Sequence, residues 1–501
     1  MSPVRLLPLI LVSLSLGLTP AAAETAQTAD AKLKTETTAT SILDLLPADS
    51  VTGHVLKTSD GEIAYQATAG TLSLRGTDGK VSAKVYYTAY VKTGGGNRPL
   101  TFAFNGGPGA ASAYLHLGFA GPRIVDFGPE GNDGANAKMV DNPESWLRFT
   151  DLVFIDPVGT GWSRPAGTGA EFYGVRQDAE SIAKVIALYV QKNNRAEAPK
   201  YLLGESYGGF RSAKVATALK QSQGMLVSGI VMVSPMIESS LIFGGTDYPL
   251  GAALQLPSIA AAELERQGKF DPEAVKEAEK FAMTDYLVSL AGAAPRGPEA
   301  DAFFGKVATL TGIDRGRVER ARGFIGNMTG RTEDGQVASP YDASETTPDP
   351  FPETPGARPD DIVLDGYTRA YGSFFASYAR NELGYASEMT YSLLSTDVNR
   401  RWDWKDGRSG TRLSAGATDD IRELLATIPS FRLMVMHGYS DVITPYGASR
   451  YVLDHLPLPL AEGRTELTLY RGGHMFYTLK GSLKAANDDA KAFYAKAART
   501  E

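Results

Sequence analysis

The apolar residues of this chain follow two different patterns. Between about residues 55 and 92, apolar and polar positions alternate in segments such as GEIAYQATAGTLSLRG and KVSAKVYYTAYVK, which Gly-containing turns separate. Alternation with a period of two is typical of strands that bury one face, so this part is predicted to form antiparallel hairpins. Five later runs are apolar throughout, as in strands of a parallel sheet that is buried on both faces: residues 99–107, 151–156, 200–205, 227–235 and 431–438.

Helical patterns separate several of these apolar runs. They cover residues from about 173 to 192 and from 207 to 222, and another at about 480–498 follows a further strand pattern within 464–474. Strands that alternate with helices predict an α/β fold, with a mostly parallel central sheet covered by helices on both faces.

The sheet pattern stops between residues 238 and 400. Helical segments such as SIAAAELERQGKFDPEAVKEAEKFAMTDYLVSLA occupy this stretch, and a Pro-rich segment at 339–360 is predicted to be a linker. We therefore expect a mainly helical cap at 238–400, inserted between the two parts of a core formed by residues 46–237 and 401–501.

The first residues of the chain have a third pattern. Arg5 precedes the apolar run LLPLILVSLSLGL, which ends before Pro20 and is followed by AAAE. A positive residue, a short apolar run and an Ala-x-Ala site predict a signal peptide at residues 1–23, cut after Ala23. An uncleaved membrane anchor is the alternative, but the run is short for a membrane span. Residues 24–45 are rich in Ala and Thr without apolar periodicity, which predicts a flexible lead-in.

Composition and charge narrow the function classes. The 501 residues are 43% hydrophobic with a net charge of −7 and no basic stripe, which argues against a nucleic-acid partner. The chain has no cysteine, so it has no disulfide and no thiol nucleophile, and an exported protein of this kind is compatible with a bacterial periplasm or secretion. Its five histidines show no metal-ligand spacing, so neither a metal nor another cofactor is expected.

The segment Gly204-Glu205-Ser206-Tyr207-Gly208 fits the pattern G-x-S-x-G. In a nucleophile elbow this motif follows a buried strand and opens a helix, so that the serine is exposed on a sharp turn at the edge of the sheet. The apolar KYLLGE before it and FRSAKVATALK after it supply both elements. Ser206 is therefore a candidate nucleophile, and the alternative is a strand-to-helix turn that only needs glycine.

A serine nucleophile needs a histidine to take its proton and a carboxylate to orient that histidine. Asp441 in HGYSDVITP and His474 in YRGGHMF both follow predicted strands, in the chain order Ser, Asp, His that this fold uses. Separately, Asp441 could cap a turn and His474 could be structural. His437 and His455 are competitors, but the first lies at the end of a buried strand and the second within a helix, and neither lies in a loop after a strand.

The oxyanion of an acyl-transfer reaction needs backbone N–H donors. The residue after the nucleophile, Tyr207, is one expected donor, and the Gly-rich loop FNGGPGAAS after an earlier strand is the expected source of another. Taken alone, that loop could equally be an ordinary Asn-Gly turn.

The motifs FNGGPGAAS, DLVFIDPVGTGWSRP, GESYGG, HGYSDVITP and YRGGHMF occur in this order, and together they resemble the serine carboxypeptidases, a family of α/β-hydrolases. The likeness covers about residues 99–240 and 430–478. It implies removal of single C-terminal residues from peptides through an acyl-enzyme. In this resemblance Ser206 is the nucleophile, His474 the general base and acid, and Asp441 its orienting carboxylate, while Gly107 and Tyr207 donate to the oxyanion.

The resemblance also implies a site for the free carboxylate of the substrate. Asn105 and Gly106 of the NGGPG motif and Glu205 before the serine would bind it. A protonated Glu205 can donate a hydrogen bond to a carboxylate, whereas an ionised one repels it.

Two positions depart from the family pattern. Ala110 stands where eukaryotic members have a disulfide-bonded cysteine, and Phe119, in LGFAGP, stands where many members have a second glutamate that pairs with the first. The chain therefore lacks the partner acid that would help to keep Glu205 protonated.

The expected activity is that of an exported serine carboxypeptidase that acts on peptides with a free C-terminus, without a membrane anchor after signal cleavage. An esterase, amidase or acyltransferase with the same triad is the nearest alternative, and a non-catalytic binding protein on a hydrolase fold is a remote one. The pattern does not indicate the oligomeric state or the preferred C-terminal residue.

Overall fold

A computed structural model describes residues 41–129, 131–326, 335–353, 361–405 and 410–498. The predicted signal peptide at 1–23 and most of the predicted lead-in lie outside these residues. Among the helices of the described ranges, none is both long and apolar enough to cross a membrane.

The central sheet has ten strands in the order β1-β2-β3-β7-β4-β9-β10-β13-β14, with β8 beside β3. From β7 to β14 all neighbours are parallel, whereas β1, β2 and β3 pair antiparallel and β3 joins the parallel part antiparallel to β7. The hairpins and the mostly parallel sheet predicted from the sequence are both confirmed. The strands are β1 Ser50–Thr58, β2 Gly61–Arg75, β3 Val81–Lys92, β4 Leu100–Phe104, β7 Asp151–Ile155, β8 Arg164–Pro165, β9 Lys200–Glu205, β10 Gly229–Val233, β13 Arg432–Gly438 and β14 Thr465–Tyr470.

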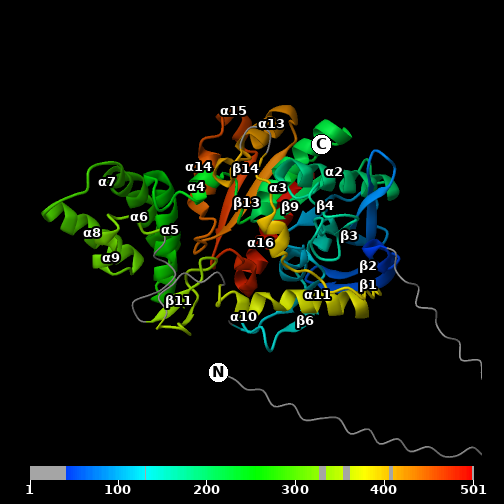
Figure 1. Cartoon of the computed structure of the whole chain (residues 1–501), viewed down its shortest axis with the longest axis horizontal. Helices are drawn as coiled ribbons and strands as arrows, with labels where there is room; N and C mark the ends of the chain where they lie inside the picture. The colour runs from blue at the N-terminus through cyan, green and yellow to red at the C-terminus, as the bar shows by residue number, and fades with distance from the viewer. Residues whose placement is uncertain (1–40, 130, 327–334, 354–360, 406–409, 499–501) are drawn as a thin grey trace, which may run out of the picture. The chain divides into compact units, whose positions relative to one another are not determined.

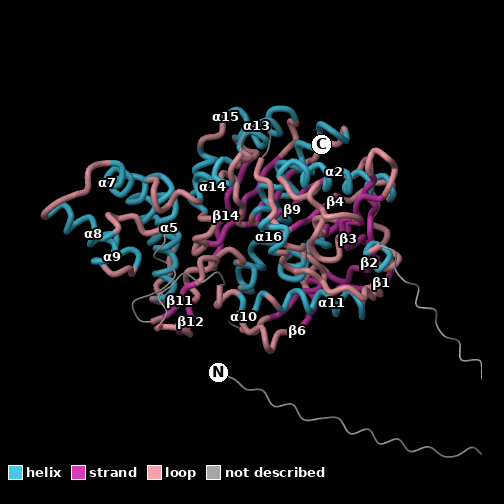
Figure 2. Tube along the Cα trace, in the orientation of Figure 1, coloured by secondary structure: helices cyan, strands magenta, loops and turns pink. Residues whose placement is uncertain are grey.

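Helices cover both faces of this sheet, as expected (Figures 1 and 2). On β10, Ile230 and Met232 belong to the apolar core on one face, and Val231 and Val233 belong to the core on the other. A strand buried on both faces in this way shows no polar alternation in its sequence. One core contains α2 Val175–Lys192, α3 Tyr207–Ala218, α13 Thr418–Thr427 and α14 Tyr446–Asp454, and the other contains α11 Ala370–Asn381 and α16 Lys480–Ala498.

Residues 238–400 divide between two environments. Five helices form a separate apolar cluster, and α5 packs against α14 of the core. By contrast, Phe375 and Tyr378 of α11 lie in the core beneath the sheet. The clustered helices are α5 Pro249–Arg266, α6 Pro272–Phe281, α7 Leu287–Ala291, α8 Pro298–Thr311 and α9 Arg315–Arg320.

The remaining elements are short. Two small antiparallel pairs lie outside the main sheet, β5 Arg123–Asp126 with β6 Lys138–Asp141 and β11 Gln336–Ala338 with β12 Thr346–Pro348. The short helices are α1 Ala113–Leu115, α4 Ser239–Ile242, α10 Asp365–Thr368, α12 Thr396–Arg400 and α15 Leu458–Ala461. Single helical turns span Ile42–Leu45, His116–Ala120, Trp146–Arg148, Leu219–Gln223, Ala282–Tyr286, Arg412–Ser414 and Phe476–Thr478.

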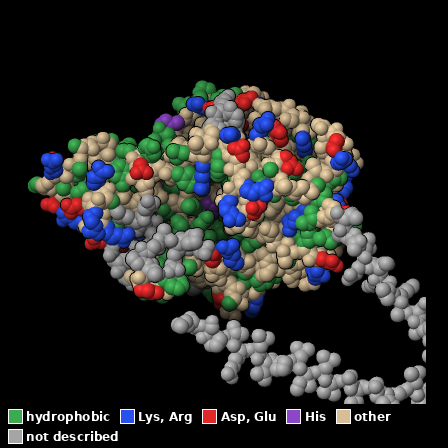
Figure 3. Space-filling model, in the orientation of Figure 1, with side chains coloured by type: hydrophobic (Ala, Val, Ile, Leu, Met, Phe, Trp, Pro, Cys, Tyr) green, Lys and Arg blue, Asp and Glu red, His purple; other side chains and the backbone are tan. Residues whose placement is uncertain are grey.

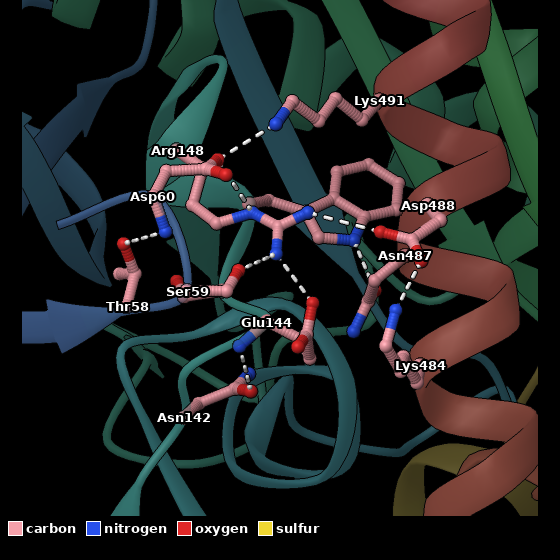
Figure 4. A network of polar contacts seen from close by, with 12 residues as sticks. Thr58, Ser59, Asp60, Asn142, Glu144, Arg148, Lys484, Asn487, Asp488 and Lys491 are labelled. Atoms are coloured by element: carbon pink, nitrogen blue, oxygen red, sulfur yellow. Dashed lines mark hydrogen bonds and ion pairs between the residues drawn. The ribbon is translucent and has the colours of Figure 1, made fainter.

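Arg148 connects the N-terminal hairpin to the last helix (Figure 4). Its guanidinium donates to Ser59 Oγ at 3.0 Å and to Asp488 Oδ1 of α16 at 3.2 Å, and it pairs with Glu144 and Asp60. The Arg148 side chain is only 2% exposed, so these partners compensate a charge that has left water. The network fixes α16, the helix that follows the loop carrying His474.

Candidate active site

Ser206 lies on a strained turn between β9 and α3. Its backbone has φ 62° and ψ −126°, a conformation that residues other than glycine rarely adopt. The glycines around it allow the turn, because a Cβ on Gly208 would lie 2.6 Å from Phe104 O and one on Gly209 would collide with Pro235. The turn leaves Ser206 partly exposed at the carboxyl end of the parallel strands, where a nucleophile elbow presents its serine.

The loop after β4 lies directly against this turn. A Cβ on Gly106 would lie 2.6 Å from Tyr207 N, so the two backbones approach more closely than any larger residue allows. Gly107 is exposed at φ 100°, and its N–H donates no hydrogen bond within the described residues. The two backbone segments expected to supply an oxyanion hole are therefore adjacent.

A buried arginine holds these two segments together. Arg211 of α3 donates to Asn105 O and, at 2.6 Å, to Asp178 Oδ2 of α2, and its guanidinium lies 5.0 Å from the centre of the Tyr207 ring. Both charged side chains of the ion pair are almost completely buried. Arg211 thus fixes the backbone of the NGG loop relative to the helix that begins after Ser206.

Asp441 and His474 form a buried hydrogen-bonded pair after β13 and β14. His474 Nδ1 lies 2.8 Å from Asp441 Oδ2. Thr444 N donates to Asp441 Oδ1 at 2.9 Å, and Thr444 Oγ1 lies 2.7 Å from Asp441 Oδ2. These contacts hold the carboxylate against Nδ1 and leave the other ring nitrogen, Nε2, for a substrate or nucleophile.

Ser206 and His474 lie on adjacent segments. Ser206 N donates to Val233 O at 2.9 Å. The hydroxyl of Ser234, the residue after Val233, donates to His474 O at 2.8 Å. No hydrogen bond joins the Ser206 hydroxyl to His474 within the described part of the chain. Such bonds are often long in enzymes without substrate and tighten on binding.

The electrostatics of His474 favour its charged form. Burial opposes the imidazolium, but the charge and hydrogen bond of Asp441, together with the charge of Glu205, outweigh burial and raise the pKa of His474. The two competing histidines are placed differently. His437 is fully buried, bonds Ser449 Oγ at 2.8 Å, and has its pKa lowered by burial to about 3. His455 is exposed and bonds Tyr451 O.

Glu205 is buried beside Ser206, and its two hydrogen-bond donors bond the same carboxylate oxygen. Asn105 Nδ2 donates to Glu205 Oε2 at 2.7 Å, and the Tyr477 hydroxyl donates to the same oxygen at 2.9 Å. No described residue hydrogen-bonds Oε1. Since Oε1 has no such partner and is not completely buried, it keeps some accessible surface. Burial raises the pKa of Glu205 to about 7, although His474, Tyr477 and Asn105 all lower it.

Phe119 supports the second of these donors. It is completely buried, and its ring stacks on Tyr477 with centroids 5.4 Å apart and planes at 29°. Where the family pattern has a second acid, this chain has an aromatic residue that packs against a hydroxyl donor. Burial is thus the main cause of the elevated pKa of Glu205, and no carboxyl group of the described residues hydrogen-bonds to it.

A segment that sequence reasoning described as a linker lies on the Asp441 and His474 loops. Tyr341 O accepts from His474 N at 2.6 Å, and Pro340 O accepts from Val442 N and Ile443 N. The Tyr341 ring also meets the His474 ring edge to face at 5.2 Å. Tyr341, Thr444 and Tyr477 were missed from the sequence, although Thr444 lies within the motif HGYSDVITP and Tyr477 directly follows YRGGHMF.

The described residues contain no group of three or more His, Asp or Glu side chains suited to a metal ion. Acyl transfer by a serine, a histidine and an aspartate needs none.

Comparison with known proteins agrees with this geometry. Residues 62–241 match the family model described as serine carboxypeptidase. Serine carboxypeptidase-like 44 of Arabidopsis thaliana is 27% identical over 160 residues, 32% of each chain. The pheromone-processing carboxypeptidase KEX1 of Yarrowia lipolytica is 32% identical over 139 residues, 27% of this chain and 21% of the relative. The chain thus matches about a third or less of the length of these relatives.

A solved structure matches over more of the chain. The prohormone-processing carboxypeptidase of Saccharomyces cerevisiae aligns with a TM-score of 0.55 at 14% identity and covers 86% of this chain and 92% of its own. At this identity the match shows the fold, and it confirms the predicted α/β-hydrolase class.

Proposed function

We propose that this chain, whose residues 62–241 match the family model of the serine carboxypeptidases, releases C-terminal residues from peptides through an acyl-enzyme on Ser206. The observation that carries the proposal is the set of groups around the turn at the end of β9. Ser206 lies on a strained, partly exposed turn, and the buried Asp441–His474 pair lies on neighbouring loops. Glu205, the residue before the serine, has a pKa of about 7.

In the proposed reaction, Ser206 Oγ attacks the carbonyl carbon of the last peptide bond while His474 Nε2 takes the hydroxyl proton. The N–H groups of Gly107 and Tyr207 stabilise the tetrahedral oxyanion. His474 then passes its proton to the leaving amine as the C–N bond breaks, and the remaining peptide stays as an ester on Ser206. Asp441 holds the imidazole in place throughout.

A water molecule completes the cycle. His474 removes a proton from the water as it attacks the ester carbonyl, and the same proton returns to Ser206 Oγ when the acyl bond breaks. The products are the shortened peptide and the free C-terminal residue.

The carboxylate site explains why a C-terminal residue would be selected. Since Asn105 and Tyr477 both donate to Glu205 Oε2, the proton of the neutral acid resides on Oε1, which keeps accessible surface. From there it can donate to a substrate carboxylate, together with Asn105 and the backbone of Gly106. An ionised Glu205 would instead repel that carboxylate.

The test compares an N-blocked dipeptide with its C-terminal amide and its methyl ester. We expect strong preference for the free acid, and loss of at least about 10³-fold in kcat for Ser206→Ala with all three. Preference for the ester would support the esterase or acyltransferase alternative. Labelling by a fluorophosphonate that disappears in Ser206→Ala is expected, and no labelling of the folded protein would support a non-catalytic binding role.

We also propose export to the periplasm or the medium, on the signal-peptide pattern of residues 1–23. N-terminal sequencing of the protein recovered outside the cytoplasm should then begin at Glu24, and a chain that retains Met1 there would contradict cleavage.

A further inference from the structure

Arg412 is an arginine without an anionic partner among the described residues. It begins the helical turn Arg412–Ser414, and its side chain donates no hydrogen bond and forms no ion pair within the described residues. Its guanidinium instead lies over two aromatic rings, 4.2 Å from the centre of Phe243 and 5.4 Å from that of Trp404. Burial lowers the pKa of Arg412, so the charge has lost part of its water, and no carboxylate of the described residues pairs with it.

Two aromatic residues near Arg412, Trp404 and Tyr341, contact residues of the proposed active site. On one side, the Trp404 ring meets the ring of Tyr207, the residue after the nucleophile, at 5.7 Å. On the other side, burial raises the pKa of Tyr341 and the nearby charge of Arg412 opposes that rise, and the Tyr341 ring contacts His474 at 5.2 Å. Arg412 is therefore placed between the nucleophile side and the histidine side of the site.

The aromatic contacts leave the guanidinium accessible. Phe243 is 36% exposed, and Arg412 itself remains exposed in spite of its partial burial. Figure 3 shows a hollow near the middle of one face of the molecule, with a histidine side chain in it and Lys and Arg side chains beside it. Arg412 is an exposed residue, so its guanidinium is available to a substrate.

The chemistry of this arrangement favours a carboxylate. A guanidinium presents paired N–H donors that match the two oxygens of a carboxylate, and hydrogen bonds between charged groups are stronger than those between neutral groups. The rings of Phe243 and Trp404 orient the guanidinium plane in advance, so little side-chain freedom remains to be lost on binding. A lysine side chain of the substrate in the same place would be repelled by the positive charge of Arg412.

We propose that Arg412, with Phe243 and Trp404, binds an acidic side chain of the peptide substrate at one of the two residues that flank the scissile bond. The proposal rests on the proposed carboxypeptidase function and adds a substrate class to it: peptides that end with Asp or Glu at the last or next-to-last position. This site is separate from the one at Glu205, which would bind the carboxylate of the chain end.

The test measures kcat/KM for N-blocked dipeptides that carry Glu, Gln or Lys, first at the next-to-last and then at the last position. At one of the two positions the wild-type protein should prefer Glu to Gln by about tenfold, which corresponds to about 1.4 kcal/mol. Arg412→Gln should abolish this preference and change the rate with the Gln dipeptide by less than about twofold. Arg412→Glu should favour Lys over Glu.

Arg400→Gln on α12 is the matched control, because Arg400 is exposed and has no charged partner among the described residues. It should keep the wild-type preference. Equal rates with Glu and Gln at both positions in the wild type would overturn the proposal, as would an equal loss on Glu and Gln dipeptides in Arg412→Gln. In either case hydrolysis of the Gln dipeptide would leave the carboxypeptidase function standing. No hydrolysis of any free-acid dipeptide by the folded protein would overturn both.

Discussion

The Tyr477 hydroxyl donates to Glu205 Oε2 at 2.9 Å, and the ring of Tyr477 stacks on Phe119. The chain thus holds its buried glutamate with a phenol where many relatives of the family pattern would use a second carboxyl group. A phenol at this place remains neutral, because burial raises the pKa of Tyr477 well above its usual value. Glu205 therefore has a donor whose role does not change across the physiological pH range.

Tyr477→Phe should alter the pH dependence of activity. The phenol donor lowers the pKa of Glu205, so its loss should raise that pKa and move the alkaline decline of activity to higher pH. The KM for a free-acid dipeptide should rise by about three- to tenfold because one of two contacts that orient Glu205 is lost. The kcat for a methyl ester should stay within about twofold, and a matching loss with the ester would indicate a general structural role.

Activity toward free-acid peptides should depend on pH in a bell shape. His474 must be neutral to accept a proton, so activity falls as the pH drops below its raised pKa. Glu205 must be protonated to donate, so activity falls as the pH rises through about 7. The negative charge of Glu205 favours the protonated form of His474, and the positive charge of His474 favours the ionised form of Glu205. The two groups therefore titrate as a coupled pair.

Glu205→Gln separates the two limbs of that profile. Glutamine keeps an NH₂ donor but does not ionise, so kcat/KM for the free acid should stay level from pH 7 to 9 while the acidic limb remains. The methyl ester should show only the acidic limb, even in the wild type. A decline above pH 7 that persists in Glu205→Gln would assign it to another group.

Arg148→Ala should lower the free energy of unfolding by about 2 kcal/mol, since it removes a side chain that is only 2% exposed together with its contacts to Glu144, Asp60 and Asp488. Urea unfolding followed by circular dichroism measures the change. Arg176→Ala is the control. Arg176 is 69% exposed and lies 3.8 Å from Glu180, so its loss should cost less than about 0.5 kcal/mol. Equal effects of the two substitutions would contradict a structural role for the network.

Stability should fall as the pH rises toward 8, and Glu345 should contribute to the decline. Burial, with the charges of Asp342 and Asp361, raises the pKa of Glu345 to about 8 from an ordinary value of 4.5. A carboxyl group with a raised pKa in the folded protein stabilises it below the unfolded pKa, and this stabilisation is lost as the pH rises through the folded pKa.

Glu345→Gln should therefore narrow the difference in melting temperature between pH 5 and pH 8. The same substitution at the exposed Glu319 of α9 should leave that difference unchanged. An unaltered difference in Glu345→Gln would show that Glu345 does not titrate in this range.

The fold could be predicted because its signals are local. The apolar runs at 99–107, 151–156 and 200–205 became β4, β7 and β9, and each needs only its own residues to be recognised as a doubly buried strand. The turn at Ser206 and the loops with Asp441 and His474 could be located for the same reason, since each directly follows a strand.

The supporting residues could not be predicted, because their roles depend on contacts between distant parts of the chain. Tyr341 lies in a Pro-rich segment, and nothing in SPYDAS indicates that its carbonyl accepts from a backbone N–H more than 130 residues later. Tyr477 reads as a core aromatic residue until Glu205 is found beside its hydroxyl. Arg412 has no local motif, and only its position between Trp404 and Tyr341 sets it apart.

The contacts of Pro340 and Tyr341 with the Asp441 and His474 loops have a consequence for how this protein can diversify. The segment that holds the acid and base loops belongs to the stretch 238–400 and not to the two strands that carry those loops. A shortened chain that joins β10 to β13 directly would lose these backbone bonds at the reacting groups, together with the core residues of α11 beneath the sheet. Exchange of this stretch between relatives should therefore change turnover as well as the choice of substrate, so the two properties are not independent modules.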